Sequence, residues 1–242
     1  LIISFFAFFF TFSLNIVSIF FSLYEKYNTS QNLVENTVPG YHTRIRDNIS
    51  EITQVLEDSN MEFDVYNVTN LIFESLIHTS NRKIDFRENW LLWGLGFIYE
   101  PISHTQDPSR IVSGGAALCN EASAVLNHIA EKKGYLTRYV GLDGHVLSEI
   151  QINNNWQLAD ADYGIVFPMS YAQLIELDVE ESYQITSRLL LERGFDQLEI
   201  DHYSDELFSL SNNEVTEIGM QLSPRLWLIE RTAEPLKWII SL

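Results

Sequence analysis

The stretch GGAALCNEASAVLNHIAEKKGY, residues 114–135, contains Cys119, the single cysteine of the 242-residue chain. Apolar residues recur there every three or four positions, as Leu118, Ala122, Val125, Leu126 and Ile129. This spacing predicts a helix that begins near Cys119, and Gly134 is expected to end it. Cys119 is then either a nucleophile or a small residue buried in the helix, and this stretch alone supports both interpretations.

Three extended segments are expected after this helix. Residues 136–142 and 145–152 are joined by Asp143-Gly144, a dipeptide typical of hairpin turns, and residues 156–160 follow three asparagines. A helix followed by an antiparallel meander predicts an α+β fold, with the helix packed on an antiparallel sheet. Apolar spacing also predicts helices at residues 44–57, 65–77, 171–177 and 182–193, and leaves 201–211 undecided.

The meander supplies two groups that suit thiol chemistry. A cysteine attacks as the thiolate, which a nearby base and a helix N-terminus both favour. His145 begins the second expected strand and Asp160 ends the third. Because adjacent antiparallel strands lie about 4.8 Å apart, these two side chains can meet. Asp162 has the same side-chain parity as Asp160 and is the competing carboxylate.

Four blocks within residues 115–164 resemble the transglutaminase-like core of the papain-like cysteine enzymes. In order, they are Gly115-x-x-x-Cys119-x-Glu121-Ala122, Gly134-x-x-x-Arg138-x-Val140, Gly144-His145-Val146-x-x-Glu149 and Trp156-x-x-x-Asp160-x-Asp162-Tyr163-Gly164. Upstream, Glu88-Asn89-Trp90-Leu91 and Gln106-Asp107-Pro108 resemble the lead-in of bacterial, membrane-associated members of the same superfamily.

The resemblance implies a Cys–His–Asp triad. Cys119 would be the nucleophile, His145 the general base and acid, and Asp160 the orienting carboxylate. The family spacing from Trp156 favours Asp160 over Asp162 for the third role.

The resemblance also implies an oxyanion site. The backbone N–H of Cys119 would supply one donor, and an upstream residue the other. Trp93, Trp90 and Gln106 are the candidates for that second donor.

An uncharged run at residues 1–23 predicts a membrane anchor, because a helix of that length reaches roughly 34 Å. A cleaved signal peptide is the alternative. A polar, partly helical linker is expected at 24–62, the transglutaminase-like domain at 63–212, and a C-terminal segment that could start a second membrane element at 213–242. We expect the domain on the periplasmic or extracellular side.

The charge of the chain excludes some partners. Fifteen Lys and Arg stand against thirty-three Asp and Glu, for a net charge of −18, which disfavours nucleic acid. His104, His128 and His202 lack the spacing of a metal site, and no cofactor is implied.

The sequence therefore predicts a membrane-anchored cysteine enzyme that acts on amide bonds of a protein or peptide, by hydrolysis or by transfer to an amine. A membrane-tethered interaction domain that keeps the fold without turnover is the alternative.

Overall fold

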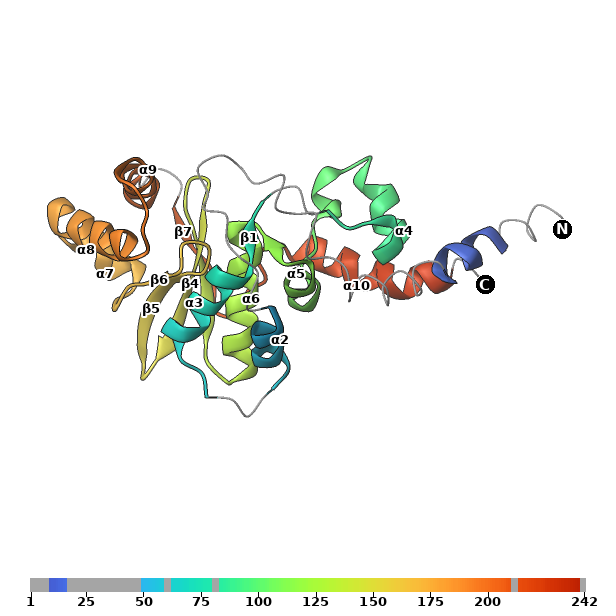
Figure 1. The fold of residues 1–242 in the computed structure, drawn as a ribbon, viewed down its shortest axis with the longest axis horizontal. Coiled ribbons are helices and arrows are strands. Elements are labelled where there is room, and N and C mark those ends of the chain that lie inside the picture. Colours follow the sequence, from blue (N-terminus) through green and yellow to red (C-terminus); the bar gives the residue numbers. More distant parts are fainter. Residues whose placement is uncertain (1–8, 17–48, 59–61, 80–82, 210–212, 240–242) are drawn as a thin grey trace.

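A five-stranded antiparallel sheet is the centre of the fold (Figure 1). The computed structural model describes residues 9–16, 49–58, 62–79, 83–209 and 213–239. Across the sheet the strands follow the order β6 (Ile165–Val166), β5 (Asn155–Asp160), β4 (Val146–Ile152), β3 (Thr137–Gly141) and β7 (Glu214–Val215). The predicted α+β class with an antiparallel sheet is confirmed.

The meander predicted from the sequence forms the middle of this sheet. Strands β3 and β4 pair from Thr137 with Ile150 to Gly141 with Val146, and β4 continues into β5 through a tight turn. Asn153 and Asn154 both have positive φ, at 49° and 64°, which suits a two-residue hairpin of the primed type.

One face of the sheet is covered by α6 (Cys119–Lys132) and α3 (Val65–Ser75), and α2 (Ile49–Glu57) and α5 (Pro108–Gly114) pack on these two helices (Figure 1). The apolar face predicted for the Cys119 helix is buried here, together with Ile150 and Ala159 of the sheet. Gly134 follows α6 with a φ of 85°, as a residue that ends a helix does. Asp64 caps α3 by accepting the N–H groups of Tyr66 and Asn67.

Helices α7 (Tyr171–Glu176), α8 (Val179–Glu192) and α9 (Gln197–Phe208) cover the opposite face (Figure 1). Val140, Leu147 and Leu158 point into this second core. The undecided segment 201–211 is helical up to residue 208, because Asp196 caps its start and Ile200, Tyr203 and Leu207 are buried at helical spacing.

Two very short strands lead into α6. β1 (Ile77–His78) runs parallel to β2 (Ala116–Ala117), with His78 opposite Ala117. Only Leu118 separates β2 from the first residue of α6. The start of that helix is therefore fixed to a segment that lies about forty residues earlier in the chain.

Helices α4 (Phe86–Gly96) and α10 (Pro224–Ile239), the 3-10 turn η2 (Glu100–Ser103) and a helical stretch at residues 9–16 form an extension beside the sheet (Figure 1). Asn15 joins its parts, because its amide donates to the carbonyl oxygen of Lys237 and accepts from the indole of Trp90. Arg110 of α5 forms ion pairs with Glu230 and Glu234 of α10, which attach the extension to the domain.

The predicted membrane anchor at residues 1–23 lies outside the described residues except for 9–16. Within the described part of the chain, no helix has the length and apolarity to span a membrane. The same holds for the second membrane element expected in 213–242, where α10 instead packs on α4 and buries Glu230 and Lys237.

The domain boundary predicted at residue 212 does not coincide with an end of the sheet. Strand β7 pairs with β3, and the N–H of Thr216 donates to the carbonyl of Tyr139. At the other end, α2 falls within the predicted linker, yet it buries Ile52 in the core. The apolar spacing of residues 44–57 predicted this helix but not its place in the core, and the two residues of β7 are too few to show a periodicity.

Candidate active site

Cys119 is the first residue of α6 and is partly exposed. The carboxylate of Glu121 accepts the backbone N–H of Leu118 at 2.8 Å, which fixes the direction in which the helix begins. The thiol therefore lies at the positive end of the helix dipole, where a negative charge is stabilised.

His145 lies between the hairpin turn and β4. Gly144 has a φ of 106° in that turn, and the N–H of Leu142 donates to the carbonyl of His145 at 2.8 Å. The imidazole Nε2 lies 2.6 Å from Oδ2 of Asp160. This bond leaves Nδ1 as the ring nitrogen available to the thiol, and Cys119 interacts with this imidazole.

Asp160 is fully buried at the end of β5. Its second oxygen, Oδ1, accepts the backbone N–H groups of Asp162 and Tyr163 at 2.9 and 3.0 Å. The turn that follows the strand thus holds the carboxylate from one side while His145 holds it from the other. Gly164 completes this turn with a φ of 69°, and a Cβ atom there would lie 2.6 Å from the ring of Phe73.

The charges around His145 favour the imidazolium. Burial lowers the pKa of His145, but the carboxylate of Asp160 and the thiol of Cys119 outweigh it and raise the pKa well above its ordinary value. The rings of Tyr163 and Tyr203 stand edge-on to the imidazole, with centroids 5.4 and 5.9 Å away. Such a group can hold a proton at neutral pH and return it to a leaving group.

The structure separates the two competing carboxylates. The β4–β5 register pairs Ser148 with Ala159, so Asp160 at the end of β5 lies close to His145 just before β4. Asp162 lies beyond the end of β5, and its carboxylate bonds instead to Nδ1 of His78 at 2.6 Å. Cys119, His145 and Asp160 are therefore the three predicted residues that the structure brings together.

Among the residues that the structure describes, the contacts of the three proposed oxyanion donors do not include Cys119. Trp93 of α4 is 43% exposed and packs edge-on against Phe86 and Phe97. Trp90 donates to Asn15, and the backbone N–H of Gln106 donates to Glu230. The second oxyanion donor stays a prediction.

Two other residues of the resemblance blocks, Arg138 and Glu149, form an ion pair in the sheet. Arg138 Nε lies 2.5 Å from a carboxylate oxygen of Glu149, and its guanidinium lies over the ring of Trp156 at 4.2 Å. The other oxygen of Glu149 accepts the N–H of Tyr171. These residues connect β3, β4 and β5 to the start of α7, which is a structural role.

Sequence reasoning did not consider His78, and it considered His104 only as a metal ligand, although both interact with carboxylates near the site. His78 follows an apolar stripe and has no neighbour in sequence that suggests a partner, since Asp162 is 84 residues away. His104 lies 3.7 Å from Glu121, whose carboxylate raises the pKa of the imidazole. Neither contact has a signal in a single sequence, because both depend on how distant segments pack.

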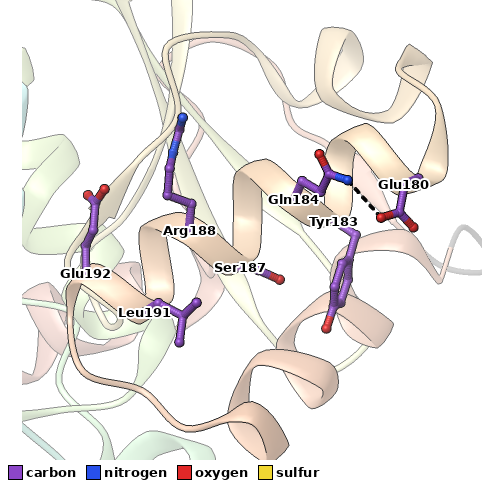
Figure 2. A pocket seen from close by; sticks show the side chains of 7 residues that line it. All are labelled: Glu180, Tyr183, Gln184, Ser187, Arg188, Leu191 and Glu192. Atoms are coloured by element: carbon purple, nitrogen blue, oxygen red, sulfur yellow. Dashed lines mark hydrogen bonds between the residues drawn. The ribbon is translucent and has the colours of Figure 1, made fainter.

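Two cavities lie away from the three residues. Figure 2 shows the first, a shallow and open surface pocket of about 470 Å³ along a single helix, α8, where Gln184 donates a hydrogen bond to Glu180. The second, of about 560 Å³, lies between α5, α6 and α10. Cys119, His145 and Asp160 line neither cavity.

Neither the comparisons with known proteins nor the arrangement of possible metal ligands assigns a function to the site. No protein-family model matches the sequence, and the comparison with curated proteins gave no match. Within the described part of the chain, no group of three His, Cys, Asp or Glu side chains could hold a metal ion. The chemistry must therefore be argued from the geometry of the residues themselves.

Proposed function

We propose that this protein is a cysteine enzyme of the transglutaminase-like, papain-like type, which transfers acyl groups from amides. The observation that carries the proposal is the buried 2.6 Å bond between His145 and Asp160, on an imidazole that interacts with the thiol of Cys119 at a helix N-terminus. A nucleophile, a base and a group that orients the base are the parts that acyl transfer requires.

The reaction has two stages. The Cys119 thiolate attacks the amide carbonyl carbon, and the carbonyl electron pair moves to oxygen, where the N-terminal N–H groups of α6 stabilise it. When the C–N bond breaks, the imidazolium of His145 gives its proton to the leaving amine. Water or a second amine then attacks the thioester, loses a proton to His145, and releases the acyl product with the thiolate restored.

Asp160 supports both stages. Its carboxylate accepts from Nε2, so the ring presents Nδ1 to the sulfur and the positive charge of the imidazolium is balanced. The site carries no feature that favours water over an amine in the second stage. The substrate class is an amide of a protein or peptide, in line with the resemblance in the sequence.

A generic acyl donor tests the proposal. With p-nitrophenyl acetate, we expect a burst of one p-nitrophenolate per chain and a mass increase of one acetyl group. Because Cys119 is the single cysteine, a thioester can form at one site only. The Cys119→Ala variant should show neither the burst nor the added mass; a full burst from that variant would contradict the proposal.

Membrane attachment belongs to the same proposal. Large apolar side chains are exposed in two runs on the extension, Phe97, Ile98 and Tyr99 after α4 and Phe9 and Phe10 of the N-terminal stretch. Contiguous exposed apolar residues mark surfaces that contact proteins or membranes. The same residues favour the second candidate, a membrane-tethered interaction domain without turnover. Co-sedimentation with lipid vesicles tests attachment, and an absent burst together with vesicle binding would favour that second function.

A further inference from the structure

A second histidine–carboxylate pair lies beside the candidate site. Nδ1 of His78 is 2.6 Å from Oδ2 of Asp162, and the side chains are 14% and 3% exposed. The mechanism above gives this pair no role. Asp162 comes from the turn after Asp160, and His78 comes from β1, which pairs with the strand that precedes Cys119.

On the first side, Asp162 belongs to the turn that holds Asp160. Its backbone N–H donates to Oδ1 of Asp160, while its carboxylate binds His78. A turn whose backbone fixes the carboxylate must itself be fixed, or the carboxylate will lose its alignment with the imidazole. The bond to His78 supplies one such restraint.

On the second side, His78 is held next to the strand that leads into Cys119. The residues on either side of His78 bond to the segment that holds β2: the N–H of Ile77 donates to the carbonyl of Gly115, and that of Thr79 donates to the carbonyl of Ala117. Because only Leu118 lies between β2 and α6, the backbone of His78 and that of Cys119 keep a fixed separation.

These contacts form a closed circuit, which runs through Cys119, His145, Asp160, Asp162, His78 and Ala117 and returns to Cys119. We propose that His78 is a positioning residue that, through Asp162, keeps Asp160 and His145 aligned with the thiol of Cys119. The inference rests on the proposed function, since it concerns the alignment of that triad.

The test compares two substitutions at one position. His78→Leu removes the donor, whereas His78→Asn keeps an N–H donor close to the place of Nδ1. We expect His78→Leu to lower the rate constant of the acetyl burst by about 10-fold or more, the scale of one charge-assisted hydrogen bond, and His78→Asn to recover most of it. His128→Asn, an exposed histidine further along α6, is the matched control and should keep the wild-type rate.

A pH profile separates alignment from general stability. The raised pKa of His145 depends on Asp160, so a misplaced Asp160 lets that pKa fall. The neighbours that face the imidazole are Asp160 from β5, Cys119 from α6, Tyr163 from the turn and Tyr203 from α9. With an acetyl p-nitroanilide in place of the ester, the leaving amine needs the proton of His145, so the acylation rate declines at alkaline pH as the imidazolium is lost. In His78→Leu, this decline should therefore move to lower pH. A merely less stable protein would keep the wild-type profile below its unfolding temperature.

The outcomes distinguish this inference from the proposed function. A burst that survives in Cys119→Ala overturns the proposed function. A burst that needs Cys119 but keeps its wild-type rate and pH profile in His78→Leu overturns the positioning role alone. If His78→Leu does not fold, Asp162→Asn decides, because it keeps the shape of the side chain and removes its charge: a slower burst and a shifted profile support the role, and wild-type values reject it.

Discussion

In both histidine–aspartate pairs a ring nitrogen lies 2.6 Å from a carboxylate oxygen, but the two pairs connect different parts of the molecule. His145 bonds through Nε2, and its imidazole also interacts with Cys119. His78 bonds through Nδ1, and its ring connects the turn after β5 to β1, which pairs with the strand before α6. The comparison teaches that the bond itself does not define a catalytic base. What defines it is a nucleophile within reach of the other nitrogen.

We expect the two pairs to differ most in how much the burst rate falls when the histidine of each pair is replaced. His145→Ala should lower the rate of the acetyl burst by about 10²–10⁴-fold, because it removes the proton acceptor and donor. This exceeds the effect expected at His78. His202→Ala, on an exposed pair with Glu206, is the control and should leave the rate unchanged. Equal losses at His145 and His78 would erase the distinction between a catalyst and a positioning residue.

The two carboxylates should rank in the same order. Asp160→Asn reverses the bond to Nε2 and presents the wrong tautomer to the thiol, so the burst rate should fall by about 10²-fold or more. Asp162→Asn should cost less, because its partner does not touch the reacting atoms. Stopped-flow measurement of both variants at one pH checks the ranking. A greater loss at Asp162 would mean that Asp162, the competitor considered from the sequence, is the orienting carboxylate.

The Arg138–Glu149 pair offers a third, purely structural case. Glu149→Ala leaves Arg138 without its partner and the N–H of Tyr171 without an acceptor, so the free energy of unfolding should fall by about 3–5 kcal/mol. Urea denaturation measures the loss. The burst rate per folded molecule should stay near wild type, and a rate loss without lost stability would contradict the structural role.

The smallest effect is the pH dependence of stability that His145 confers. Its pKa is raised in the folded protein, so its contribution is fully present below the unfolded value near 6.5 and is lost as pH rises through the folded pKa. In a Cys119→Ala background, the stability difference between His145 and His145→Gln should shrink from about pH 6 to about pH 9. Chemical denaturation at both values checks the sign, and a difference that grows with pH would contradict the raised pKa.

The sequence predicted the parts of the site that are local. The helix from Cys119 and the meander up to Asp160 were identified because periodicity, the Asp143-Gly144 turn and the Asn run act within a few residues. Strands of two residues, such as β1 and β7, carry no periodicity at all. Side-chain parity also could not separate Asp160 from Asp162, since the choice depends on where β5 ends.

The position of the triad along the chain has a consequence for folding. Cys119, His145 and Asp160 lie within one continuous stretch of helix, hairpin and hairpin, so their contacts close only short loops. Short loop closures favour rapid assembly. His78 joins this unit across 84 residues. We therefore expect residues 119–160 to bring the triad together as a nearly autonomous folding segment. The contact with His78 should form only when the N-terminal half packs against this segment.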